Sequence, residues 1–239
     1  MRIGLIGKGK WGTEIHRVLT GLGHELTVCD PTLEDSASRF DAVRQKAVVI
    51  ATPPQSHAEL CHLAIEYGTP FFVEKPVALD VIDAARIAFQ AQNSGIRGAV
   101  GHIALHQLGY QKHKYPTPKS VEITRYTKSP GYHGVTAWWD IGVHDVAVCV
   151  DLHGRPKKLR VAQDEDSYTA VLWWDDARAV LHGDRTAGRR WDFTFDGETF
   201  TPYDDPGEPL KTELEWWLDG GSNLDDAAVV VETLVRGSE

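Results

Sequence analysis

The chain has 239 residues, 42% of them hydrophobic and 25% charged, which is the composition of an ordinary globular protein. A formal net charge of −9 at pH 7 argues against partners that are polyanions, such as nucleic acid or an anionic membrane. Cys29, Cys61 and Cys149 are far apart and form no CxxC spacing, so neither a disulfide framework nor a thiolate zinc site is expected. Without a recognisable leader or a long apolar run, the expected location is the cytoplasm.

Residues 1–102 alternate short apolar runs with segments of helical periodicity, which predicts a βαβ domain with a parallel sheet. Strands are expected at 2–7, 24–30, 47–52, 69–73 and 98–103, and helices at 11–23, 56–68 and 77–95. Ser56 stands where an N-cap would begin the second helix.

Residues 103–239 have a different rhythm, with consecutive strands that predict a mostly antiparallel open sheet in an α+β domain. Strands are expected at 119–127, 157–163, 167–175, 177–185 and 190–197, helices at 138–154, 209–221 and 223–237, and a connecting loop at 196–209. The predicted fold is therefore an α/β Rossmann domain, 1–102, followed by an α+β domain, 103–239.

The run "GKGKWG" fits G-x-G-x-x-G between a strand and a helix, with Gly7, Gly9 and Gly12 as its glycines and Lys10 and Trp11 between them. Such a turn lets a pyrophosphate approach the helix N-terminus closely, although a purely structural turn can have the same pattern. Asp30 ends the second strand, where a carboxylate would accept hydrogen bonds from the adenosine ribose and repel a 2′-phosphate. The sequence therefore predicts a dinucleotide site that prefers NAD to NADP.

The glycine fingerprint, "ATPPQSHAEL", "EKP" and "WWDIGVHD" together resemble the Gfo/Idh/MocA family, the NAD(P)-dependent oxidoreductases named after glucose–fructose oxidoreductase and inositol dehydrogenase. The resemblance covers most of the chain, which is a short member with only residues 107–137 between "GHIALH" and "WWDIGVHD". It implies that the loop with Thr52, Pro53, Pro54 and His57 lies near the nicotinamide ribose, with a helix cap as the alternative role of His57. Glu74 is placed with the cofactor-binding residues, and is expected to orient the backbone or Lys75.

The resemblance also implies that Lys75 of "EKP" reaches the oxygen of the reacting carbon. Pro76 supports this role because it holds Lys75 in an extended backbone at the end of a strand. Read alone, Lys75 would be a solvated surface charge, and Asp140 and His144 a helix-end carboxylate and a core histidine. With the resemblance, His144 is the expected proton-transfer group, Asp140 orients it or the substrate, and His102 lines the substrate pocket. Asp145 is expected to support His144 or the joint between the domains.

The predicted function is hydride transfer between NAD and a secondary alcohol or ketone of a sugar, cyclitol or nucleotide-linked sugar. Reduction of an imine or another non-sugar carbonyl is the alternative reaction, and a non-catalytic NAD-binding sensor or scaffold is the alternative of another class. No histidine or carboxylate group has metal-site spacing. A homo-oligomer is expected through the open face of the second sheet, with Val171, Trp173 and Leu181 among its apolar residues.

Overall fold

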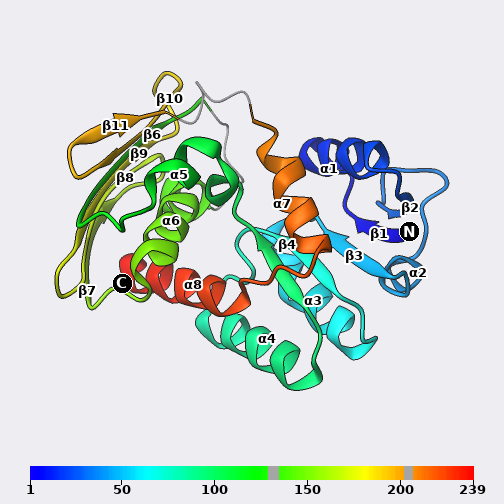
Figure 1. The fold of residues 1–239 in the computed structure, drawn as a ribbon. Coiled ribbons are helices and arrows are strands. Elements are labelled where there is room, and N and C mark those ends of the chain that lie inside the picture. The colour runs from blue at the N-terminus through cyan, green and yellow to red at the C-terminus, as the bar shows by residue number, and fades with distance from the viewer. Residues whose placement is uncertain (129–134, 202–206) are drawn as a thin grey trace. The chain divides into compact units, whose positions relative to one another are not determined.

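The computed structural model describes residues 1–128, 135–201 and 207–239, which form two compact units (Figure 1). The first unit comprises Met1–Gly101 and Leu210–Ala228, and the second comprises His102–Pro209 and Val229–Glu239. Helix α8 (Leu224–Ser238) therefore supplies residues to both units. The division at 102/103 made from the sequence assigned 210–228 to the second domain, whereas this segment packs with the first unit.

The first unit is built on a parallel sheet of five strands in the order β2-β1-β3-β4-β5. Its strands are β1 (Arg2–Ile6), β2 (Glu25–Cys29), β3 (Ala47–Ile50), β4 (Phe71–Glu74) and β5 (Gly98–Gly101). Because β1 lies between β2 and β3, the chain reverses its direction of progress across the sheet beside β1. This order places a topological switch point, where α/β sheets bind ligands, at the carboxyl end of β1. The predicted βαβ domain is confirmed.

Helices cover both faces of this sheet (Figure 1). They are α1 (Lys10–Gly21), α2 (Arg39–Val43), α3 (His57–Glu66), which follows the short helix η1 (Pro54–Ser56), α4 (Val81–Ser94) and α7 (Pro209–Leu218). One face packs α1 and α7, whose buried side chains join alternate residues of the strands in a single apolar cluster. A Cβ on Gly4 would meet the backbone of Ala42, so α2 lies directly against the other face. The unit therefore has three layers.

The return of the chain to this unit depends on α7. Leu214 and Trp217 are 0% and 1% exposed and belong to the same cluster as Leu5 and Phe72. The Trp217 ring lies 5.6 Å from the Phe72 ring, centroid to centroid. Beyond α7, the side chain of Asn223 accepts from the N–H of Val100 and donates to its carbonyl, which covers the free edge of β5. Apolar burial and edge pairing thus explain why 210–228 belongs to the first unit.

The second unit contains a sheet of six strands in the order β11-β10-β6-β9-β8-β7. Its strands are β6 (Ser120–Tyr126), β7 (Lys158–Gln163), β8 (Ser167–Trp173), β9 (Arg178–Asp184), β10 (Arg190–Phe195) and β11 (Glu198–Phe200). Only the pairing of β6 with β9 is parallel. The predicted mostly antiparallel sheet is confirmed, and β11 is a strand within the segment that was expected to be a loop.

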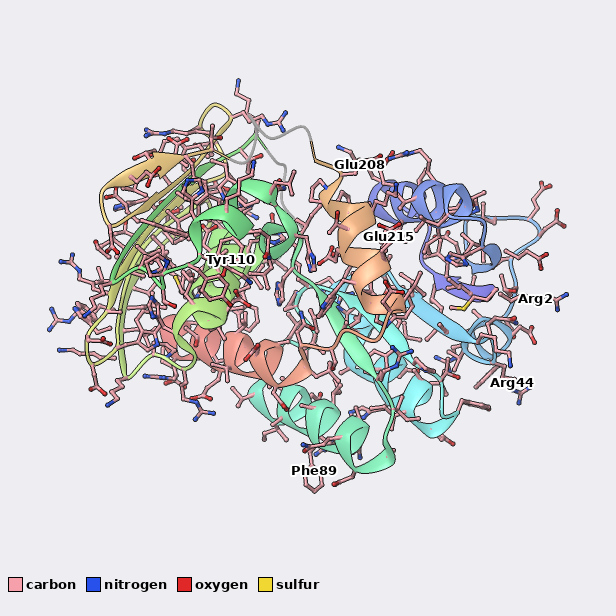
Figure 2. The ribbon with its side chains drawn as sticks, viewed as in Figure 1. Arg2, Arg44, Phe89, Tyr110, Glu208 and Glu215 are labelled. Atoms are coloured by element: carbon pink, nitrogen blue, oxygen red, sulfur yellow. The ribbon has the colours of Figure 1, made fainter. Side chains whose placement is uncertain are left out.

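One face of this sheet packs against helices. The remaining helical segments are η2 (Ile103–His106), α5 (Leu108–His113), η3 (Trp138–Gly142) and α6 (Val143–His153). Tyr110 of α5, labelled in Figure 2, is fully buried and donates a hydrogen bond to Asp151 of α6. Val230 and Leu234 of α8 belong to the apolar core that lies between these helices and the sheet.

The side chains of β8 and β9 divide between this core and the open face. Leu181 is fully buried in the core, so its predicted place on the open face is wrong. Val171 and Trp173 alternate with core residues and lie on the open face, and Val171 is paired with Val180 of β9. The open face therefore keeps an apolar strip.

Ser56 is the N-cap residue of α3, as expected, but its hydroxyl has another role. Ser56 precedes α3, but its hydroxyl donates to Thr52 Oγ1 at 2.7 Å and makes no capping bond within the described residues. Its backbone is already helical because η1 leads directly into α3. The side chain therefore braces the loop after β3 instead of the helix.

We expect Leu214→Ala to lower the free energy of unfolding by about 3 kcal/mol, because it leaves a cavity in the cluster that attaches α7 to the sheet. Urea unfolding followed by circular dichroism measures this. Glu215→Ala on the exposed side of the same helix, labelled in Figure 2, is the matched control and should change stability by less than about 0.5 kcal/mol. Equal effects of the two variants would contradict the packing of α7.

Candidate functional site

The turn between β1 and α1 depends on two glycines. Gly7 has φ +91°, a conformation that L side chains rarely adopt. A Cβ on Gly12 would lie 2.2 Å from the carbonyl oxygen of Gly7, so only glycine lets the first turn of α1 approach the strand this closely. The result is a helix that begins at the carboxyl edge of the sheet, beside the switch point.

Gly9 differs from these two glycines, because a Cβ there would meet nothing within 4 Å among the described residues. It is the N-cap of α1, and within the described chain no side chain caps the helix. The first N–H groups of α1, at Lys10 and Trp11, have no partner within the helix, and the space beside Gly9 lies at the positive end of the helix dipole. This arrangement fits a pyrophosphate, and Gly7, Gly9, Lys10, Trp11 and Gly12 are the residues that would hold it.

Asp30 follows β2 directly and is 7% exposed. Its carboxylate accepts from the hydroxyl of Thr32 at 2.6 Å, from the N–H of Thr32 at 2.9 Å and from the N–H of Lys8 at 2.5 Å. These donors, the Thr32 hydroxyl foremost, hold the pKa of Asp30 below its usual value. A carboxylate has about four acceptor positions, so the three bonds leave one for a ribose hydroxyl. Asp30 is thus a fixed negative charge at the expected adenosine end of the site.

The loop Thr52–Pro54 follows β3, and His57 lies behind it. His57 is 0% exposed, with Nδ1 2.7 Å from the carbonyl oxygen of Pro76 and Nε2 2.8 Å from that of Thr52. Burial lowers the pKa of His57, although both carbonyls favour its protonated form. The imidazole therefore joins the loop after β3 to the loop after β4 from within the unit, and the role as a helix cap does not apply.

Glu74 ends β4 and Lys75 follows it, at the same edge of the sheet as the glycine turn. The indole Nε1 of Trp11 donates to Glu74 Oε1 at 2.5 Å, which connects α1 to the end of β4. Loss of hydration raises the pKa of Glu74 to about 7, although the hydrogen bond from Trp11 and the positive charge of Lys75 both lower it. The Lys75–Pro76 peptide bond is cis.

Asp140 belongs to the second unit and lies in η3, whose backbone has π-helical geometry. It is 7% exposed, and its Oδ2 is 3.7 Å from Nη1 of Arg185, which is itself 4% exposed. Arg185 also donates to the carbonyl oxygens of Val135 and Glu165. A buried carboxylate is stable only when a partner compensates its charge, and Arg185 is such a partner for Asp140.

His144 and His102 are the two histidines predicted in this unit. His144 lies in the first turn of α6 and is partly exposed, whereas His102 precedes η2 and is 3% exposed. Asp145 is the acidic neighbour of His144, and its expected support of His144 or of the joint between the domains stays a prediction. It is fully buried, and Arg125 at 2.9 Å and the hydroxyl of Tyr168 donate to it within the same unit.

Part of the chain is similar to a known protein family. Residues 30–102 match the model of an oxidoreductase family with an NAD-binding Rossmann fold. This family is Gfo/Idh/MocA, to which residues 30–102 of the chain are similar. The first unit is accordingly an NAD-binding Rossmann domain, as the glycine turn and Asp30 indicated.

The relatives of the chain are distant in sequence. An uncharacterised oxidoreductase of Escherichia coli is 23% identical, with 77% of this chain and 64% of the relative aligned. Inositol 2-dehydrogenase 4 of Saccharopolyspora erythraea is 29% identical, with 55% of this chain and 42% of the relative aligned. The match thus spans about half the length of these relatives.

The fold of the whole chain is like that of UDP-N-acetylglucosamine 3-dehydrogenase from Acidithiobacillus ferrooxidans. The two structures have a TM-score of 0.90 at 19% identity, with 99% of this chain and 96% of that chain covered. Both units therefore have the arrangement of elements found in that structure.

The described residues contain no candidate for a membrane-spanning helix or for a metal site. None of their helices combines the length and the apolar character needed to cross a membrane. None of their clusters of histidine, cysteine and carboxylate side chains has the make-up of a metal site.

Arg185 and Thr32 are residues that sequence reasoning missed. Arg185 is far from Asp140 in the chain, and no local pattern signals that it would be buried beside it. Thr32 follows Asp30 by two residues, and a hydroxyl at that spacing is a recognised way for a carboxylate to order its own turn. A search for such short-range partners would have found Thr32 but not Arg185.

Paired glycine variants test the proposed cofactor turn between β1 and α1. Gly9→Ala should leave the free energy of unfolding within about 1 kcal/mol and weaken NAD binding about tenfold, because its Cβ enters the space assigned to the pyrophosphate. Gly12→Ala should lower the free energy of unfolding by about 2 kcal/mol, because its Cβ meets the Gly7 carbonyl. Thermal unfolding and NAD titration measure the two effects. Unchanged NAD affinity in Gly9→Ala would contradict the placement of the pyrophosphate.

Proposed function

We propose that the chain is an NAD-dependent oxidoreductase that moves hydride between the nicotinamide and a secondary alcohol or ketone carbon of a sugar, cyclitol or nucleotide-linked sugar. The observation that carries this proposal is the position of Lys75. It follows β4 at the edge of the sheet where the glycine turn lies, and its neighbour Glu74 is bonded to Trp11 of that turn. The names of the relatives, an inositol dehydrogenase and a UDP-N-acetylglucosamine dehydrogenase, support this class of substrate.

Lys75 is the group proposed to act on the reacting oxygen. Bound NAD supplies the hydride acceptor, and the ammonium of Lys75 donates a hydrogen bond to the substrate hydroxyl. As the carbon loses hydride, negative charge grows on that oxygen, and a fixed cation stabilises it more than it stabilises the neutral alcohol. Residues Thr52, Pro53, Pro54 and His57 support the loop proposed to lie against the nicotinamide ribose.

His144 is proposed to take the hydroxyl proton in oxidation and to return it in reduction, since imidazole titrates near neutral pH. Asp140 is proposed to orient His144 or a substrate hydroxyl, and the neighbouring Arg185 keeps its carboxylate in one position. His102 is proposed to line the substrate pocket.

We expect Lys75→Ala to lower turnover by about 10² or more while NAD affinity changes less than a few fold, because the lost contact is strongest in the transition state. The measurement is reduced-nicotinamide absorbance with NAD and a panel of cyclitols, sugars and nucleotide sugars. Lys112→Ala, which changes an exposed lysine of α5, is the control and should keep full activity.

The panel also separates the alternatives. Activity confined to imines or non-sugar carbonyls would replace the proposed substrate class. A protein that binds NAD but turns over none of these compounds would be a sensor or scaffold. Normal turnover of Lys75→Ala would refute the role of Lys75.

We also propose that the chain forms a homo-oligomer through the open face of the second sheet. Val171, Val180 and Trp173 form an apolar strip there, and the ammonium of Lys158 lies 5.5 Å from the centre of the Trp173 ring. An apolar face has a lower free energy when a second copy covers it than when it is exposed to water. A standard two-fold contact buries on the order of 1,600 Å². Charged residues lie between the apolar ones, so a partner in this contact must carry the opposite charges at the facing positions.

Light scattering tests this oligomer, since a mass near 26.5 kDa at micromolar concentration would reject it. Val171→Asp should convert the oligomer to monomers, because it buries an unpaired charge in the contact. Phe89→Asp is the matched control, since Phe89 is 64% exposed on α4 of the first unit (Figure 2), and it should leave the mass unchanged.

A further inference from the structure

Asp30 has donors on both of its carboxylate oxygens, and they come from two different segments of the first unit. Its Oδ1 accepts from the hydroxyl of Thr32 at 2.6 Å and from the N–H of Thr32 at 2.9 Å. Its Oδ2 accepts from the N–H of Lys8, in the glycine turn between β1 and α1, at 2.5 Å. The carboxylate therefore joins the turn after β2 to the turn that would hold the pyrophosphate.

The free acceptor position of this carboxylate lies on one particular oxygen. Each carboxylate oxygen has about two lone-pair positions, and Thr32 occupies both positions of Oδ1. Oδ2 accepts a single bond from the described residues, so its second position is the one left for a ribose hydroxyl. Because Oδ2 is also the oxygen bonded to the glycine turn, a ribose bound there lies next to the pyrophosphate to which it is joined.

The backbone of Asp30 is held as well as its side chain. Its N–H donates to the hydroxyl of Ser36 at 2.9 Å, and its carbonyl oxygen accepts from the N–H of Leu33 at 3.1 Å. Pro31 follows it, and a proline favours an extended backbone at the residue before it. The side-chain torsions of Asp30 are then the remaining freedom, and the hydroxyl of Thr32 restricts them.

Thr32 makes this contact from an exposed position. Residues 31–35 are all exposed, so the side chain of Thr32 belongs to neither apolar core. The second unit has the same local arrangement, because the N–H and the hydroxyl of Thr186 donate to Oδ1 of Asp184 at 2.6 Å and 2.7 Å. What distinguishes Thr32 is that its carboxylate partner is also bonded to the glycine turn.

We propose that Thr32 is a specificity-determining residue, which positions the carboxylate of Asp30 so that the site binds the adenosine ribose of NAD and rejects the 2′-phosphate of NADP. This inference rests on the proposed NAD-dependent function and is independent of the substrate. A 2′-phosphate would bring a second negative charge against that of Asp30, which the donors hold in place. Without the Thr32 hydroxyl the carboxylate can turn away, and the positive charge of Lys8, which acts on Asp30, is then available to the phosphate.

Isothermal titration calorimetry with NAD and with NADP measures the two dissociation constants without any turnover. The unmodified protein should bind NAD more tightly. Thr32→Val removes the hydroxyl but keeps the shape of the side chain, and it should lower the preference for NAD about tenfold, which corresponds to one hydrogen bond to a charged group. Thr32→Ser retains the hydroxyl and should keep the preference within about twofold, because the hydrogen bond remains.

Thr186→Val is the matched control, because it removes the same hydroxyl contact from Asp184 in the second unit. Its two dissociation constants should equal those of the unmodified protein. Thermal unfolding of Thr32→Val and Thr186→Val should give similar small losses of stability, since the two contacts are alike.

The outcomes distinguish this inference from the proposed function. If the affinities of Thr32→Val for NAD and NADP stay unchanged or fall by the same factor, the hydroxyl only stabilises its turn and the inference is wrong. An equal loss of preference in Thr32→Ser, or tighter binding of NADP than of NAD by the unmodified protein, would also overturn it. In each of these cases the proposed oxidoreductase stands, whereas failure of the unmodified protein to bind either cofactor would overturn both.

Discussion

The close approach of Gly12 to the carbonyl of Gly7 is the constraint on which the first unit depends. At 2.2 Å from that oxygen, no Cβ can be accommodated, and α1 therefore begins directly above the end of β1. This position leaves the N–H groups of its first turn open and brings Trp11 within hydrogen-bonding distance of Glu74. Both the proposed pyrophosphate site and the contact beside Lys75 follow from this one turn.

In the second unit, buried ion pairs are the contacts that fix the candidate site residues against the sheet. Asp140 lies beside Arg185, and Asp145 lies between Arg125 and Tyr168. Each carboxylate would be unstable in the core without its partner, because isolated buried charges lose their hydration. The guanidinium of Arg125 also stacks on the ring of Trp191 at 3.7 Å from its centre. These contacts hold the η3–α6 segment against the sheet, and with it the residues proposed to transfer the proton.

Much of the candidate site was predictable because its signals are short-range. The turn at Gly7, Gly9 and Gly12 was identified by spacing, and Asp30 by its place at the end of a strand. Positive φ at Gly7 and the carboxylate at the edge of the sheet agree with those predictions. The hydroxyl at Ser56 also had a short-range signal, but it bonded to Thr52 because η1 already supplied a helical turn before α3.

By itself the sequence determined the kinds of element, their order along the chain and the residue types at the strand ends, since periodicity and turn chemistry act over a few neighbouring residues. Only the tertiary structure decided which distant segments meet. Leu181 and Val171 both stand in strands with apolar residues on two faces, so alternation alone could not say which one faces the helices. The return of Leu214 and Trp217 to the first sheet, the pairing of Arg185 with Asp140 and the bond from Trp11 to Glu74 are of the same kind. Each joins residues far apart in sequence, and its free energy exists only once the whole fold brings them together.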